Sequence, residues 1–161
     1  MTTDHVTTDH VGLVESAMVQ IRRSQRRRSL AHTARKRNSG PATVPDSVVE
    51  VLDVLEFAAT AGAAATVSTV AAALSVDQPR ASRLVASAVD AGFVRRVADQ
   101  ADGRRVTLVP TAAGRALTRR VHEFRRSMFA AAMADWSAAE RREFARLLTL
   151  FVERLTDGRD A

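Results

Sequence analysis

Residues 66–109 read TVSTVAAALSVDQPRASRLVASAVDAGFVRRVADQADGRRVTLV, and this stretch decides the fold. Its first part predicts a short helix, because apolar side chains recur at helical spacing behind Ser68, a candidate N-cap. Residues 75–77 make a tight turn in which Asp77 can cap a second helix. Pro79 falls in the first turn of that helix, where a missing N–H group costs nothing.

The second helix has one apolar face and one polar face. Its polar side chains project mostly from the first two turns, and Gly92 ends it as a left-handed glycine would. The apolar face consists of Ala81, Leu84, Val85, Ala88 and Val89, and the polar side chains are Gln78, Arg80, Ser82 and Arg83. This pattern is typical of a helix-turn-helix, which offers the N-terminal end of its second helix to a major groove.

A two-stranded hairpin is predicted directly after the second helix. Residues 93–97 and 105–109 are rich in β-branched and apolar residues, and the polar loop between them contains Asp102 followed by glycine. Arg104 at the exposed tip suits a minor groove, whose negative potential attracts a guanidinium. The fold class expected is therefore mainly α with a small β-hairpin wing, a winged helix-turn-helix with helical additions.

These motifs resemble the winged helix-turn-helix core of the MarR family of bacterial transcriptional regulators. The close resemblance covers residues 66–116, and the helical layout on either side agrees with it. Pro110 departs from the family pattern, which usually has an apolar strand residue there, and predicts an early end of the second strand. The motifs that carry the resemblance are Leu74, Gln78-Pro79-Arg80-Ala81-Ser82-Arg83, Gly92-Phe93-Val94, Asp102-Gly103-Arg104, and Thr111 with Gly114.

The resemblance implies a homodimer that binds double-stranded DNA and regulates transcription as a repressor on a pseudo-palindromic operator. It implies that the first, fifth and sixth helices interlock the two subunits. It further implies a small-molecule effector, often aromatic or anionic in such regulators, that releases the operator. Its pocket would be walled by the first, second and fifth helices near His32, Leu55 and Val121.

The residues expected to contact DNA lie at the helix starts and in the wing. Arginine can grip guanine and glutamine can grip adenine in a bidentate manner, whereas serine suits phosphates or base edges. The alternative for the two helix arginines is a structural ion pair with Asp77 or Asp90. Pro79 could pack on a thymine methyl or only begin the helix, and Ser68 could bind phosphate beside Thr69 or only cap. The expected set is Ser68, Thr69, Gln78, Pro79, Arg80, Ser82, Arg83, Asp102, Arg104 and Arg105.

Long amphipathic segments flank the winged helix. Helices are expected over residues 9–37, from a cap at Asp46 or Ser47 to residue 60, and from a cap at Thr111 to residue 134. The last helix is expected over residues 138–156, after a capping box formed by Ser137 and Glu140. The outer apolar stripes need burial, which a symmetric dimer supplies. The domains expected are residues 1–45, a basic helix and linker for dimerisation; residues 46–110, the DNA-binding domain; and residues 111–161, the dimerisation helices.

Charge and composition favour a polyanionic partner. The 161 residues carry a net charge of +6, with 46% hydrophobic residues and no cysteine. Without cysteine there is no disulfide or thiol sensor, and a cytoplasmic location is expected. No run of about 18 apolar residues occurs, so no membrane partner is expected. Residues 22–28 and 35–37 hold eight positive charges. They indicate either a nucleic-acid arm or, as favoured here, a basic first helix of the dimer.

Other function classes find little support in the sequence. His5, His10, His32 and His122 are isolated without metal-ligand spacing, and neither a nucleophile elbow nor a phosphate loop occurs. We therefore expect no enzyme activity, no cofactor and no metal site. Two alternatives remain open: an architectural DNA-binding protein without sequence choice, and a small-molecule-binding or enzymatic domain with a vestigial helix-turn-helix.

Overall fold

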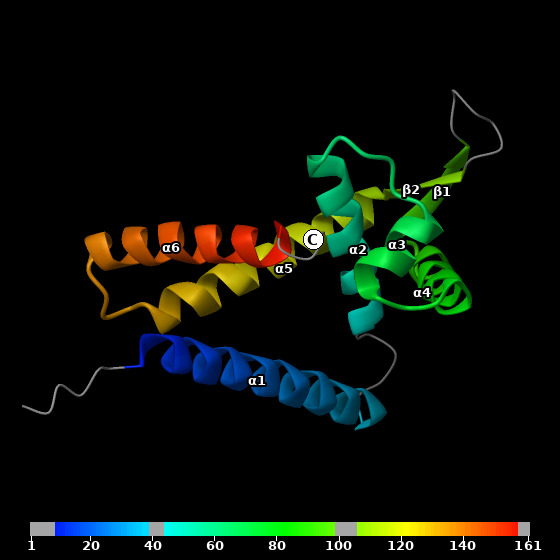
Figure 1. Ribbon diagram of the computed structural model, residues 1–161. Helices are drawn as coiled ribbons and strands as arrows, with labels where there is room; N and C mark the ends of the chain where they lie inside the picture. The colour runs from blue at the N-terminus through cyan, green and yellow to red at the C-terminus, as the bar shows by residue number, and fades with distance from the viewer. Residues whose placement is uncertain (1–8, 39–43, 99–105, 158–161) are drawn as a thin grey trace, which may run out of the picture.

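The computed structural model describes residues 9–38, 44–98 and 106–157. The described part is mainly helical with a two-stranded antiparallel hairpin, which confirms the predicted fold class (Figure 1). In chain order the elements are α1 (His10–Asn38), α2 (Asp46–Thr60), α3 (Val67–Leu74), α4 (Gln78–Asp90), β1 (Val94–Ala98), β2 (Val106–Pro110), α5 (Ala112–Ala132) and α6 (Ala138–Asp157).

The hydrophobic core lies within the winged helix. Helix α2 is its centre, because α2 packs against α3, α4, β2 and the start of α5. The predicted apolar face of α4 is confirmed, since Ala81, Val85 and Ala88 are fully buried. The largest fully buried side chains are Val48, Val51, Val70, Val85 and Val94. A core of valine and alanine brings the helices close together, so the polar face of α4 is held on a rigid base.

The start of α3 differs from the expectation that Ser68 caps it. Thr66 is the N-cap, and its hydroxyl accepts the N–H of Thr69 at 3.2 Å while the Thr69 hydroxyl accepts the N–H of Thr66 at 3.2 Å. This reciprocal capping box starts the helix at Val67, so Ser68 lies inside the first turn and cannot cap. The cap of α4 is as predicted, because Asp77 accepts the N–H of Arg80 at 2.7 Å.

Helix α2 begins without the side-chain cap that we expected from Asp46 or Ser47. The N-cap position is Pro45, and Asp46 is the first helical residue, where its negative charge faces the positive end of the helix dipole. Phe57 also falls off the apolar face of this helix and is 77% exposed.

The hairpin runs to Pro110, so the prediction that this proline shortens the second strand is wrong. Val94 pairs with Pro110 at one end of the register and Ala98 pairs with Val106 at the other. A proline is tolerated at a strand end, where few ladder bonds are needed. The N–H of Leu108 also donates to the Ala65 carbonyl at 2.8 Å, which fastens the wing to the segment before α3.

A tight junction joins the end of α4, the start of the wing and the start of α5. Gly92 has φ +77°, as predicted for the residue that ends α4. The Thr111 hydroxyl donates to the Gly92 carbonyl at 2.7 Å and accepts the N–H of Gly114 at 3.1 Å, which makes Thr111 the predicted N-cap of α5. The N–H of Thr111 donates to the Phe93 carbonyl at 2.9 Å. A Cβ atom at Gly114 would collide with that same carbonyl oxygen.

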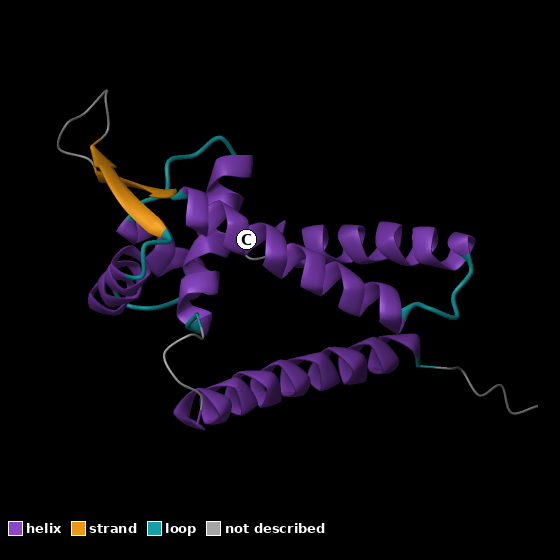
Figure 2. Cartoon of the chain, turned by 180° about the vertical axis from the view of Figure 1, so that it is seen from behind, coloured by secondary structure: helices purple, strands orange, loops and turns teal. Residues whose placement is uncertain are grey.

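Helix α1, the outer part of α5 and α6 extend to one side of the winged helix (Figure 2). Among their described side chains, the one large apolar group that is buried is Leu117, near the start of α5. The capping box expected at the start of α6 is confirmed, because Ser137 and Glu140 bond each other. Trp136 packs edge-on against Phe144, with ring centroids 5.1 Å apart.

Within one chain, the apolar face expected to be buried on α6 is largely exposed. The exposed large apolar side chains are Val11, Leu13, Val14, Met18 and Ile21 on α1, Phe124 and Phe129 on α5, and Phe144, Leu147, Leu148, Val152 and Leu155 on α6. Among the described helices, none combines the length and the apolar character needed to cross a bilayer.

The close packing at this junction predicts that Gly114→Ala lowers the stability of the fold. The added methyl group would push against the Phe93 carbonyl and against Leu52, which has a methyl carbon 3.3 Å from the Cβ position. Overpacking of this kind destabilises a fold by about 1–3 kcal/mol. Thermal unfolding followed by circular dichroism should show a clearly lower midpoint. Ala113→Ser, on the exposed neighbouring position, is the control, and equal midpoints for both variants would contradict the role of the junction.

Candidate nucleic-acid interface

The expected DNA-contact residues of the helix-turn-helix lie together on the outer surface of α4 and α3. Gln78, Pro79, Arg80, Ser82 and Arg83 are all exposed, and they occupy the first two turns of α4. Ser68 is exposed at the start of α3, where its hydroxyl oxygen lies 3.4 Å from the Gln78 amide nitrogen and accepts its hydrogen bond. The start of α3 and the start of α4 thus form one continuous polar surface. Thr69 is half-buried and its hydroxyl is engaged in the α3 capping box.

The two helix arginines do not form the ion pairs that were the alternative reading. Arg83 donates from Nε to the Pro79 carbonyl at 3.4 Å, which lays its guanidinium along the helix surface. The Asp77 carboxylate is engaged with the backbone N–H of Arg80. In the described part of the chain, neither Arg80 nor Arg83 is within 4.0 Å of a carboxylate. Both guanidinium groups therefore remain available to an outside anion.

Glu50 on α2 lies in the electrostatic field of Arg80. The pKa of Glu50 is raised, first because the carboxyl is partly desolvated although the residue is exposed overall, and then because Asp46 and Asp53 repel its charge. Arg80 acts in the opposite direction and lowers this pKa. The fold therefore disfavours the ionised form of Glu50, and the positive charge of Arg80 reduces this effect.

The wing adds further positive charge beside the helix-turn-helix. Arg95 and Arg96 on β1 are both exposed. The Thr107 hydroxyl donates to the Val97 carbonyl at 3.2 Å and braces the two strands. Asp102, Arg104 and Arg105 lie outside the described residues, so their placement stays a prediction.

Helices α2 and α5 are joined by two polar contacts that no sequence spacing indicated. Arg125 donates to both carboxylate oxygens of Asp53, at 3.1 and 2.7 Å. His122 Nε2 lies 3.0 Å from a carboxylate oxygen of Glu56. The pKa of Arg125 is raised, first by its hydrogen bond to Asp53 and against the effect of partial burial. Asp53 and Arg125 are 72 positions apart in the chain, and Glu56 and His122 are 66 apart, so only the fold brings them together.

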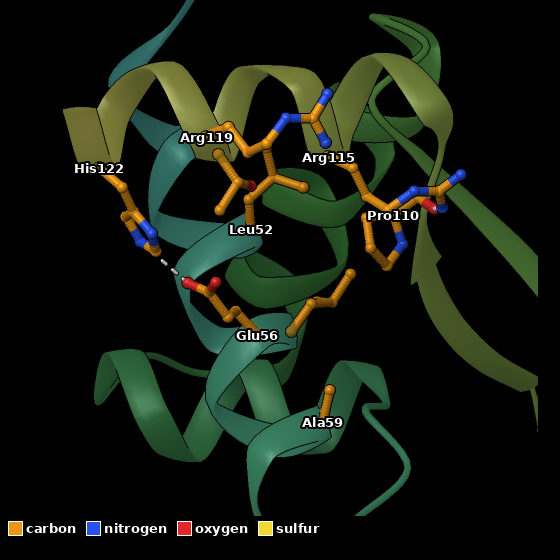
Figure 3. A pocket seen from close by; sticks show the side chains of 9 residues that line it. Leu52, Glu56, Ala59, Pro110, Arg115, Arg119 and His122 are labelled. Carbon is orange, nitrogen blue, oxygen red and sulfur yellow. Dashed lines mark hydrogen bonds and ion pairs between the residues drawn. The ribbon is translucent and has the colours of Figure 1, made fainter. Parts of the chain in front are cut away.

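A cavity of about 310 Å³ opens beside these contacts (Figure 3). Its apolar wall comes from α2 and Pro110, and Arg115, Arg119 and His122 come from α5. The Arg115 guanidinium donates to the Pro110 carbonyl at 2.9 Å, whereas Arg119 has no such partner among the described residues. The full lining is Leu52, Leu55, Glu56, Ala59, Pro110, Arg115, Thr118, Arg119 and His122.

The cavity only partly matches the effector pocket that we expected. Leu55 lines it as expected. Val121 does not line it and instead packs half-buried against the core. The backbone of His32 lies in α1, but its side chain is outside the described residues. No described side chain of α1 lines the cavity, so its walls are α2, α5 and the end of β2.

The fold and the exposed polar face of α4 define the chain as a winged helix-turn-helix protein. Residues 44–105 match the model of the MarR family. The predicted resemblance to the MarR family is therefore confirmed for this segment, and the whole chain shares the fold of solved MarR family structures. A search of curated proteins finds no match.

Three solved structures illustrate the similarity of the fold. A MarR family protein from Bacillus stearothermophilus has a TM-score of 0.69 at 20% identity, over 91% of this chain and 95% of that chain. FabT from Streptococcus pneumoniae, solved in complex with DNA, has a TM-score of 0.65 at 20% identity, over 91% of this chain and 98% of that chain. MepR from S. aureus, bound to ethidium bromide, has a TM-score of 0.56 at 19% identity, over 82% of this chain and 95% of that chain.

Proposed function

We propose that this protein is a sequence-specific DNA-binding regulator of transcription that acts as a homodimeric repressor on a pseudo-palindromic operator. The observation that carries the proposal is the pair of exposed arginines, Arg80 and Arg83, on a helix whose other face packs into the core. Neither arginine has a carboxylate partner among the described residues. Because its target is bacterial DNA, we place the protein in the cytoplasm. We assign residues 46–110 to DNA binding and residues 1–45 and 111–161 to dimerisation.

The arrangement of α4 suits entry into a major groove. A helix that reads bases needs long polar side chains at its N-terminal end and a rigid base behind them. Arg80, Arg83 and Gln78 supply the polar side chains, and the buried alanines and valine of α4 supply the base. The net charge of +6 adds attraction to phosphates that carries no sequence information. The solved DNA complex of FabT, a protein of similar fold, supports this interpretation.

The proposed dimer follows from the apolar side chains that one chain leaves exposed. Phe124 is 68% exposed on α5, and a row of apolar side chains on α6 is about half exposed. Monomeric soluble proteins rarely leave contiguous apolar faces of this extent in water. A second copy that packs the same faces against the first would bury them with two-fold symmetry. Two copies of α4 would then face successive major grooves, about one helical turn apart.

We further propose that the cavity between α2 and α5 binds a small organic effector. Its apolar wall and the unpartnered Arg119 suit a flat apolar body with a negative charge. Its volume of about 310 Å³ lies within the range of small-ligand pockets. A ligand there contacts both α2 of the DNA-binding part and α5 of the dimerisation part, so it can shift the two α4 helices relative to each other. The ethidium complex of MepR, a protein of similar fold, supports a ligand role for this fold.

The DNA proposal predicts that Arg83→Ala weakens binding to the promoter DNA upstream of the protein's own gene. Loss of one base-contacting arginine costs about 1–3 kcal/mol, which is about a 5- to 150-fold loss of affinity. Fluorescence anisotropy with promoter and scrambled duplexes, at several salt concentrations, measures the affinity and the preference. Arg142→Ala removes one exposed arginine from α6 and is the matched control.

A preference for one DNA sequence distinguishes a transcriptional regulator from an architectural DNA-binding protein. A regulator prefers its operator over scrambled DNA by about 1,000-fold or more, and Arg83→Ala should reduce that preference. Equal affinity of the wild type for both duplexes would favour the architectural alternative. Absence of binding to either duplex would refute DNA binding.

The dimer proposal predicts that Leu148→Glu separates the subunits. A carboxylate at this position would be buried without a partner in the dimer and would lower the association constant at least about 100-fold. Sedimentation equilibrium over a range of concentrations gives the mass in solution. Thr149→Glu adds the same charge about 100° further round α6, off the row of apolar side chains, and should stay dimeric. A wild-type chain that stays at 17.4 kDa at high concentration would refute the dimer.

The effector proposal predicts that an aromatic carboxylate raises the thermal midpoint of the wild type. At a ligand concentration about 100 times the dissociation constant, the stabilisation is about 2.7 kcal/mol. Salicylate and benzoate are suitable probes, and benzyl alcohol tests the need for charge. Arg119→Ala should remove the preference for the carboxylates, whereas Arg142→Ala should keep it. If all three compounds leave the midpoint unchanged, the cavity does not hold this class of ligand.

A further inference from the structure

Four ionisable side chains gather between α2 and α5 at the edge of the cavity. Asp53 and Glu56 are three residues apart on α2, so they share one face, and His122 and Arg125 have the same spacing on α5. The two pairs meet across the helix interface through the contacts Asp53–Arg125 and Glu56–His122. With a neutral His122, the cluster holds two negative charges and one positive charge. The cluster then has a net charge of −1, which favours the binding of an additional cation.

The spacing of three of these groups approaches that of a metal site. One potential ligand atom from each of Asp53, Glu56 and His122 lies within 4.8 Å of the other two. Four ligands around a tetrahedral zinc ion, each about 2.1 Å from the metal, are about 3.4 Å from one another. The imidazole nitrogen of His122 and the carboxylate oxygen of Glu56 are already 3.0 Å apart. Rotation of the Asp53 side chain, with release of Arg125, would bring its carboxylate to a similar distance.

We propose that Asp53, Glu56 and His122 form a binding site for a divalent first-row transition metal ion, with Zn²⁺ as its representative. The imidazole selects against Mg²⁺ and Ca²⁺, which prefer oxygen ligands alone. Three protein ligands leave a coordination position for water. A neutral His122 binds the ion through Nε2 in the tautomer that carries its proton on Nδ1, so the ion replaces the contact between Nε2 and Glu56 and the ring stays neutral.

Arg125 is the resident cation of the cluster and competes with the metal. Its guanidinium holds both oxygens of Asp53, at 3.1 and 2.7 Å, and must release at least one of them before Asp53 can bind an ion. The four side chains are 34% to 45% exposed, so Arg125 can swing into water and an ion can enter from solvent. Metal binding would replace one cationic bridge between α2 and α5 by another.

The metal site overlaps the effector cavity only at Glu56 and His122, and it does not depend on DNA binding. Glu56 and His122 also border the cavity, but Asp53 and Arg125 do not line it, and the apolar wall and Arg119 take no part in the metal cluster. The test can therefore be made on the purified full chain without any DNA. Failure of metal binding would leave the regulator proposal untouched, and failure of DNA binding would leave the metal site untouched.

The experiment is a titration of the metal-free full chain with Zn²⁺ against a chromophoric chelator, with Co²⁺ spectra as a second readout. We expect one tight site per chain, and ligand-field bands of Co²⁺ that indicate nitrogen and oxygen ligands. His122→Ala and Glu56→Gln should each weaken Zn²⁺ binding by at least about 10-fold, the scale of a lost partner at a metal site. His10→Ala and Glu123→Gln are the matched controls, because both residues are exposed, and both variants should bind as the wild type does.

Arg125→Gln keeps the proposal falsifiable if a ligand variant folds poorly. Because this substitution frees Asp53 from its competitor, Zn²⁺ affinity should rise by about 10-fold, the reverse of a loss that damage to the fold would cause. The proposal is overturned if the wild type binds no more tightly than His122→Ala. It is also overturned if Glu123→Gln weakens binding as much as Glu56→Gln, or if Arg125→Gln leaves the affinity unchanged or lower.

Discussion

The hydrogen bonds of Thr111 are the constraint on which the rest of the structure depends. Its hydroxyl group joins the Gly92 carbonyl at the end of α4 to the N–H of Gly114 in the first turn of α5, and its own N–H holds the Phe93 carbonyl. The helix proposed to read DNA, the wing and the long helix that leaves the domain thus meet within a few ångströms. A tilt of α5 cannot be absorbed there by a loose linker. A tilt of α5 therefore changes the position of α4 through the packed core, or it moves the winged helix as a whole.

Helix α2 provides the second connection between the two parts. Its apolar face forms the centre of the core, while Asp53 and Glu56 on its other side contact α5 through Arg125 and His122. The apolar contacts are buried and hold α2 firmly to α4, but the polar contacts to α5 are one-third exposed or more. Exposed ion pairs contribute little to stability and can be exchanged for other partners. The interface between α2 and α5 is therefore the part of the molecule where a ligand or an ion can act at low cost.

Sequence reasoning succeeded where structure is decided by local rules. The caps at Asp77, Thr111 and Ser137, the left-handed Gly92 and the apolar face of α4 all follow from residue type and spacing over a few positions. It failed at the starts of α2 and α3, because α2 begins after Pro45 without a side-chain cap and the capping box of Thr66 and Thr69 starts α3 before Ser68. It could not find the Asp53–Arg125 and Glu56–His122 contacts, since their members are far apart in the chain. His122 was judged isolated for that reason.

The structure also divides the arginines into two groups that the sequence does not distinguish: those that pair with a carboxylate of the same chain and those that do not. Arg125 and Arg146 hold carboxylates, at 2.7 Å in both cases, so their charges serve contacts within the chain. Arg80 and Arg83 lie on a surface where the nearby acids are either occupied, as Asp77 is by a backbone N–H, or partly desolvated, as Glu50 is. A guanidinium without a carboxylate partner keeps its attraction for a phosphate or a guanine. The net charge alone favours a polyanion, and the lack of carboxylate partners for Arg80 and Arg83 among the described residues makes the start of α4 the place where we propose that it binds.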